Sequence, residues 1–130
     1  GKTINELFAD FGEDGFRKIE RKCIDEIPAS ENCFIATGGG TPCFFDNMEY
    51  MNSAGDTVYL RTSVQELFER LVLSETKRPL IEGKSPEELE RYISDALSKR
   101  EMHYMKSKYI LDTDLLNPNN ILESYLELKV

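Results

Sequence analysis

An arginine and a glutamate three residues apart form the first pair in the chain that could do chemistry. Arg17 and Glu20 stand in the stretch FRKIE, which follows a helical pattern. At about 100° per residue, Glu20 falls among the apolar positions Phe16 and Ile19, and Arg17 lies on their flank. A carboxylate on the core side of a helix is costly unless it is paired. Two hypotheses stay open: a structural ion pair, or an arginine that Glu20 orients to bind an anionic substrate group.

Three consecutive glycines are the strongest local signal. Gly38, Gly39 and Gly40 follow the apolar run CFIAT at 33–37, which predicts a strand covered on both faces. In open α/β sheets, ligands bind outside the carboxyl ends of the strands. Consecutive glycines let a backbone approach a ligand closely and offer its N–H groups. The position therefore favours a binding site.

Two more arginines have competing interpretations. Arg100 continues the apolar line of a long predicted helix, where it either snorkels to the surface or points into a pocket. Arg78 lies in the polar stretch 74–84 and is either a solvated charge or part of a lid that closes over transferring phosphates. His103 is the only histidine and has no partner pattern, so neither a triad nor a metal site is expected. Residues 41–45 (TPCFF) are expected to provide local packing after the glycine turn.

Helices and strands that alternate along the chain must position these residues. Capping signals, glycines and prolines delimit the elements. The predicted helices cover residues 4–11, 13–27, 46–55 and 64–73, a long segment that starts at 85, and a last segment that opens at 117. The predicted strands are 33–37, 57–60 and 109–111. This alternation predicts an α/β class with a parallel sheet and helices on both faces.

Composition narrows the classes of function. The 130 residues suit one domain, and they are 40% hydrophobic and 31% charged. With 16 basic against 24 acidic side chains, the net charge of −8 makes a nucleic-acid surface unexpected. Apolar stretches are too short for a membrane span, and no signal-peptide pattern opens the chain. Cys23, Cys33 and Cys43 predict buried or half-buried thiols in a reducing, cytoplasmic compartment.

A series of short motifs resembles the shikimate kinase family in order and spacing. The motifs are GKTINELF at 1–8, FRKIE at 16–20, IATGGG at 35–40, TVYL at 57–60, RPL at 78–80, and KR at 99–100 with Tyr104. The resemblance covers roughly Gly1 to Asp114. It implies a P-loop kinase of the nucleoside-monophosphate-kinase type. Such an enzyme transfers the ATP γ-phosphate to the 3-hydroxyl of shikimate, with Mg²⁺, in the biosynthesis of chorismate and aromatic amino acids, and is a monomer when complete.

The resemblance also implies roles for individual residues. Arg17 and Arg100 resemble the two arginines that bind the shikimate carboxylate, and Glu20 resembles the acid that orients the first. Gly38, Gly39 and Gly40 resemble the turn whose backbone meets the shikimate hydroxyls. Arg78 is similar to the lid arginine that reaches the phosphates, and Arg70 to an arginine near adenine.

The chain departs from the family at the nucleotide site. A P-loop requires GxxxxGK[ST] after a strand, whereas this chain has only the tripeptide GKT at 1–3. The family pattern places a strand, the P-loop, its helix and a second strand ahead of this point, roughly 40 residues. We therefore expect residues 1–130 to be a single incomplete kinase domain. In it, the helices of 1–30 bind shikimate and 74–84 form the lid, while the catalytic base and the metal ligands lie elsewhere. Leu116 stands where some members carry an adenine-stacking arginine, and Met102 and His103 replace a usual Pro-Leu.

These departures predict an unpaired sheet. In the family, the P-loop strand lies between the strands that 33–37 and 57–60 resemble, so its absence would expose two edges. We expect that these 130 residues alone do not form a stable, active monomer: either a preceding N-terminal segment completes the domain, or the fragment persists only by swapping or intermolecular pairing. Two alternatives stay open: a non-catalytic shikimate-binding relative, and a kinase for another small polyol acid. Paired carboxylate-binding arginines argue against a neutral acceptor.

Overall fold

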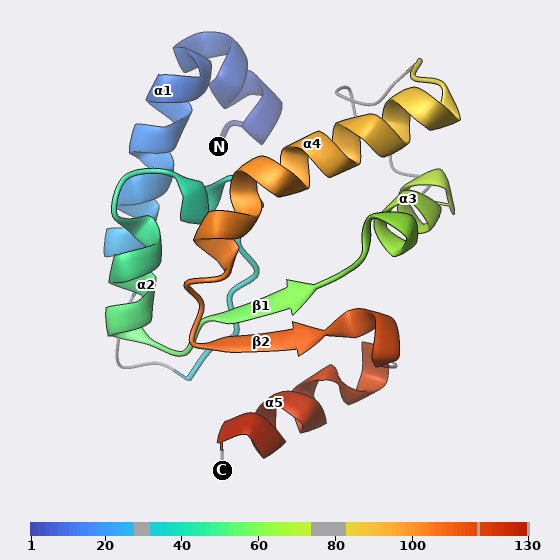
Figure 1. Ribbon diagram of the computed structural model, residues 1–130. Coiled ribbons are helices and arrows are strands. Elements are labelled where there is room, and N and C mark those ends of the chain that lie inside the picture. The colour runs from blue at the N-terminus through green and yellow to red at the C-terminus, as the bar shows by residue number, and fades with distance from the viewer. Residues whose placement is uncertain (28–31, 74–82, 117, 130) are drawn as a thin grey trace. The chain divides into compact units, whose positions relative to one another are not determined.

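The computed structural model describes residues 1–27, 32–73, 83–116 and 118–129 (Figure 1). The chain forms two compact units, Gly1–Asp56 and Thr57–Val130, which are described separately below. None of the helices in these ranges is both long and apolar enough to cross a membrane.

The first unit is built on helix α1, Ile4–Asp25, which contains a break at Gly12. Gly12 has φ +66°, a left-handed conformation that interrupts helical geometry, so the predicted stop there is confirmed. At the start, the Thr3 side chain accepts from the Glu6 N–H, and the Glu6 carboxylate accepts from the Thr3 N–H at 2.7 Å. Phe8 and Phe16 stack at 4.3 Å between centroids and join the two arms of the break.

A short 3₁₀ helix, η1 (Thr41–Cys43), and helix α2 (Asn47–Ala54) complete this unit. Asp46 and Glu49 stand three residues apart, a capping signal that predicts Asp46 as the cap of α2, and this prediction is wrong in its detail. The Asp46 side chain makes no capping hydrogen bond and instead pairs with Arg21 across 3.2 Å. A carboxylate that is drawn to a neighbouring guanidinium is no longer free to face the helix N–H groups.

The strand predicted at 33–37 is not formed. Residues 32–38 have no regular structure, and Phe34 and Ile35 are 84% and 53% exposed. A strand exists only through its hydrogen-bonded neighbours, and within the described ranges the sheet has two strands, neither of which is this segment. Without that cover, Cys33 is exposed, as is Cys23, while Cys43 is half-buried, so the prediction of sheltered thiols is wrong for two of the three.

The second unit contains the parallel pair that the sequence predicts. Strands β1 (Val58–Arg61) and β2 (Tyr109–Asp112) pair from Val58 with Tyr109 to Arg61 with Asp112. The helices are α3 (Val64–Leu73), α4 (Pro86–Tyr104) and α5 (Ile121–Lys129), with the short 3₁₀ turns η2 (Thr113–Leu115) and η3 (Pro118–Asn120) before α5. A connection that contains α3 and α4 therefore joins two parallel strands, the arrangement of α/β proteins.

Helices α4 and α5 lie on opposite sides of these strands (Figure 1), and an aromatic pair attaches each helix. Tyr59 packs on Tyr104 of α4 at 5.1 Å, and Tyr109 meets Tyr125 of α5 edge-on at 5.5 Å. Tyr59 is one position out of phase with Tyr109 in the register, so the two side chains point to different faces. Burial, and then the charge and hydrogen bond of Glu101, raise the pKa of Tyr59 to about 12.

Candidate anion-binding site

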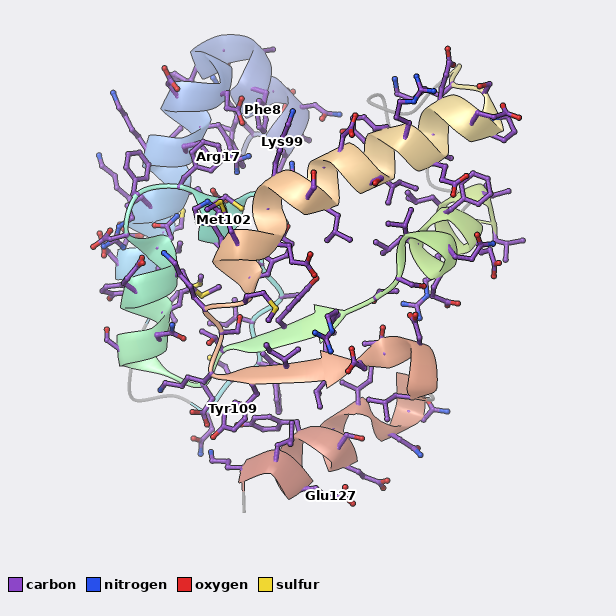
Figure 2. All side chains as sticks on the ribbon, in the orientation of Figure 1. Phe8, Arg17, Lys99, Met102, Tyr109 and Glu127 are labelled. Carbon is purple, nitrogen blue, oxygen red and sulfur yellow. The ribbon has the colours of Figure 1, made fainter. Side chains whose placement is uncertain are left out.

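The guanidinium of Arg17 is buried in the first unit. It lies on α1 beyond the break at Gly12 and is 8% exposed (Figure 2). Its Nη1 donates to Oε2 of Glu20 at 2.9 Å, and its Nη2 donates more weakly to Oε1 of Glu13 at 3.4 Å. The Glu20 side chain is 15% exposed and that of Glu13 is 59% exposed, so Glu20 is the partner that is sheltered from water. The predicted Arg17–Glu20 pair is therefore confirmed as a contact.

Aromatic rings flank this guanidinium. Cζ of Arg17 lies 4.3 Å from the centroid of Phe44 and 5.3 Å from that of Phe16. A planar, weakly hydrated guanidinium is suited to lie over a ring, where the π electrons attract its charge. The rings take the place of water around Arg17 and so strengthen its interaction with any anion that reaches it.

The glycine turn passes directly against the same guanidinium. A Cβ atom at Gly40 would lie 2.8 Å from Cζ and 2.9 Å from Nη1 of Arg17, which is closer than real side chains approach. Gly40 has φ −82°, an ordinary value, so what favours glycine here is the space that the guanidinium occupies and not the backbone conformation. At Gly38, a Cβ atom would meet the Thr41 hydroxyl at 3.3 Å. The turn is closed by hydrogen bonds from the Thr41 N–H to the Gly38 carbonyl and from the Cys43 N–H to the Gly40 carbonyl.

Arg17 retains donors that no described residue uses. A guanidinium carries five N–H donors in a planar fork, and its buried Nε has no hydrogen-bond partner in the described part of the chain. A buried, unsatisfied donor is costly, and a ligand oxygen can satisfy it. The fork geometry of arginine matches a carboxylate or a phosphate. The arrangement can therefore bind a small planar anion.

The structure brings together part of the predicted set of site residues. Arg17, Glu20, Gly38 and Gly40 contact one another or their immediate neighbours, and the Gly39 carbonyl accepts from the Cys43 thiol at 3.8 Å. Arg78 lies outside the described residues.

The other two predicted arginines belong to the second unit. Arg70, on α3, is exposed and donates to Glu66 at 2.7 Å. Arg100, on α4, is half-buried, and the described residues provide no hydrogen-bond or ion-pair partner for it.

Three residues at the site were predicted only to pack locally or were not predicted at all. Thr41 donates its hydroxyl to Oε1 of Glu20 at 2.5 Å, Phe44 covers Arg17, and Asn47 donates to the Thr41 carbonyl at 2.8 Å. Their position shortly after the glycines could have predicted that they belong to the site, because a turn that carries a binding site needs side chains that hold it in place.

The tripeptide GKT at the start of the chain is engaged in helix capping. Lys2 pairs with Asp10, and the Thr3 hydroxyl takes part in the capping box with Glu6. These contacts agree with the prediction that the tripeptide only resembles the end of a P-loop. No group of three or more histidine, cysteine, aspartate or glutamate side chains in the described ranges is placed to hold a metal ion.

The fold and the site together define an α/β protein with a parallel strand pair and a buried arginine that can bind a small anion. The family model described as shikimate kinase matches residues 1–129. A shikimate kinase of Phocaeicola vulgatus is 46% identical over 126 residues, which are 97% of this chain and 72% of the relative. One from Parabacteroides distasonis is 47% identical over 113 residues, 87% of this chain and 65% of the relative. The crystal structure of shikimate kinase from Bacteroides thetaiotaomicron aligns with a TM-score of 0.87 at 43% identity and covers 98% of this chain and 73% of that one.

This chain belongs to the shikimate kinase family, which comprises small-molecule kinases of aromatic amino-acid biosynthesis. It spans about 72% of the length of the first of these relatives. The match confirms the family resemblance of the sequence motifs.

Proposed function

We propose that this chain provides the shikimate-binding part of a kinase that transfers the γ-phosphate of ATP to the 3-hydroxyl of shikimate. The observation that carries the proposal is the buried Arg17 guanidinium, held by Glu20 against Gly40 with its Nε unsatisfied. Membership of the shikimate kinase family supports the choice of substrate. A carboxylate is the group on shikimate that such a fork accepts.

Each residue of the site has a role in this proposal. Arg17 binds the carboxylate, Glu20 fixes its orientation, and the backbone of Gly38, Gly39 and Gly40 meets the ring hydroxyls. Arg100 supplies a second positive charge for the carboxylate. Arg78 reaches the phosphates from the lid at 74–84, and Arg70 lies near adenine.

The contribution of these residues to the reaction is positioning. Phosphoryl transfer depends on an acceptor hydroxyl that is held in line with the phosphate and on charge stabilisation around it. A rigid arginine that fixes one end of shikimate also fixes where its 3-hydroxyl lies. ATP and Mg²⁺ complete the reaction in the family, and the described residues are assigned neither the base nor the metal ligands.

Calorimetric titration with shikimate tests the proposal, and two neighbouring arginines give a matched pair. Arg17→Ala removes the carboxylate fork, and two lost charge-assisted hydrogen bonds correspond to a loss of affinity of about 100-fold or more. Arg21, one helical turn further along α1, is paired with Asp25 and Asp46 and has no role in the site. Arg21→Ala is therefore expected to retain the affinity of the parent. Equal affinities in the two variants would contradict the assignment of Arg17.

A further inference from the structure

The second oxygen of Glu20 is held by a residue from another part of the chain. Oε2 of Glu20 accepts from Arg17, while Oε1 accepts from the hydroxyl of Thr41 at 2.5 Å. Thr41 is 3% exposed, so water does not compete for this hydrogen bond. Each carboxylate oxygen thus has its own partner, and Glu20 meets Arg17 through one oxygen only.

Thr41 is itself fixed by Asn47. The Asn47 side chain is fully buried, and its Nδ2 donates to the Thr41 carbonyl at 2.8 Å. A carbonyl can only accept, so the amide nitrogen and not the amide oxygen must face it. The Thr41 N–H also donates to the Gly38 carbonyl, so the residue is tied to the glycine turn on one side and to α2 on the other.

We propose that Thr41, supported by Asn47, is a positioning residue for anion binding. It acts by preventing Glu20 from bonding to Arg17 through both carboxylate oxygens. An unrestrained carboxylate beside a guanidinium favours the bidentate arrangement. In that arrangement Glu20 would occupy the N–H groups of Arg17 that a substrate carboxylate needs. By engaging Oε1, the Thr41 hydroxyl leaves these donors available. This inference rests on the proposed function, since it assumes that the anion is the shikimate carboxylate.

The test is a titration of the full chain with shikimate in four variants, two at Thr41 alone and two in which Glu20 is replaced. Thr41→Val keeps the shape but removes the hydroxyl, and we expect affinity to fall about tenfold, the equivalent of one lost hydrogen bond to a charged group. Thr41→Ser restores the hydroxyl and is expected to restore the affinity. In a Glu20→Ala background, Thr41→Val is expected to have no further effect, because the competitor is gone. If Thr41 only packed against the turn, Thr41→Ser would not restore the affinity, and Thr41→Val would still lower the affinity in the Glu20→Ala background.

A second measurement does not depend on shikimate. In nuclear magnetic resonance spectra, the side-chain N–H signals of Arg17 report how Glu20 holds the guanidinium, and we expect Thr41→Val to change these signals while Thr41→Ser does not. Thr41→Ala serves the same comparison if the valine variant melts below the temperature of the experiment.

The outcomes separate the two proposals. A parent protein that is folded by circular dichroism and does not bind shikimate overturns the proposed function, while the Arg17 signals still test the link from Thr41 through Glu20. A parent that binds shikimate, with Thr41→Val indistinguishable from it in both affinity and Arg17 signals, overturns this inference and leaves the proposed function intact.

Discussion

Two arginines in the two units of the molecule occupy similar places in the sequence pattern and differ in how they are held. Arg17 is buried, bonded to Glu20 and covered by Phe44. Arg100 is half-buried and has no hydrogen-bond or ion-pair partner in the described part of its unit. A pre-organised side chain loses less conformational entropy when it binds a ligand than a free one does. Arg17 is therefore pre-organised for an anion, whereas no described residue holds Arg100 in a comparable way.

The largest effect is expected from closing the space beside Arg17. Gly40→Ala places a Cβ atom within 3 Å of the guanidinium, so Arg17 must leave its position and shikimate affinity should fall about as far as in Arg17→Ala, about 100-fold. Gly55→Ala is the control, because a Cβ atom there meets nothing within 4 Å. Calorimetric titration measures both. A Gly40 variant that retains the parent affinity would mean that the guanidinium tolerates displacement and is not pre-organised.

The stability of the two arginine variants should differ as well. Arg17→Ala leaves the sheltered Glu20 carboxylate without its ion-pair partner and should reduce the free energy of unfolding by about 2–3 kcal/mol. Arg100→Ala removes no such partner and should change it by less than about 0.5 kcal/mol. Urea unfolding followed by circular dichroism measures both values. Similar losses in the two variants would remove the contrast between Arg17, which Glu20 holds, and Arg100, which has no hydrogen-bond or ion-pair partner among the described residues.

The second unit has a buried polar group of its own, Tyr59, whose ionisation tests its packing. Its raised pKa of about 12 lies above the ordinary value of 10, so the unfolded chain loses the phenol proton first. The contribution of this pKa difference to the free energy of unfolding is fully present below pH 10. It falls as the pH rises toward 12, and the loss is about 1.4 kcal/mol at pH 11. Tyr59→Phe should lack this fall. We would compare urea unfolding of parent and variant at pH 8 and pH 11; parallel losses in the two proteins would show that Tyr59 is not sheltered.

The smallest effects concern the capping boxes, one in each unit. Thr3→Ala and Ser85→Ala each remove a side chain that caps a helix and should cost about 0.5–1 kcal/mol. Hydrogen exchange measures where the loss falls: we expect α1 to lose protection in the first variant and α4 in the second. Asp46→Ala is the control, since Asp46 makes no capping hydrogen bond to α2 and should leave the protection of α2 unchanged. A loss of protection in both units from either capping variant would show that they unfold as one.

Local patterns predicted most of the helices and both strands of the second unit. Some features depend only on residues that are close together in the chain, so the sequence alone predicts them. These are the capping boxes at Thr3 and Ser85 and the break at Gly12. The strand at 33–37 could not be judged in this way, because its formation depends on a neighbouring strand and not on its own apolar residues.

The contacts within the candidate site were predictable only where the two residues share an element. Arg17 and Glu20 lie three residues apart on α1, and their spacing reveals the pair. The contact from Thr41 to Glu20 spans 21 residues, and no periodicity relates the two positions. Phe44 likewise reaches Arg17 only because the glycine turn brings it there.

The predicted instability of these 130 residues as an isolated monomer stays a prediction. Two features of the described chain favour it. In the described sheet, β1 pairs with β2 on one edge only, and the outward residues Val58 and Leu60 are 36% and 45% exposed. Phe34 and Ile35 are also uncovered. Apolar side chains beside an open strand edge favour association with further strands.

The most direct test of the central claim compares shikimate with its methyl ester, which lacks the negative charge. If Arg17 binds the carboxylate, the parent protein binds shikimate at least about tenfold more tightly than the ester, the equivalent of one lost charge-assisted hydrogen bond. Arg17→Ala is then expected to bind both weakly and with similar affinity. A parent protein that binds the two ligands equally, or an Arg17→Ala variant that keeps the preference for shikimate, would contradict the account.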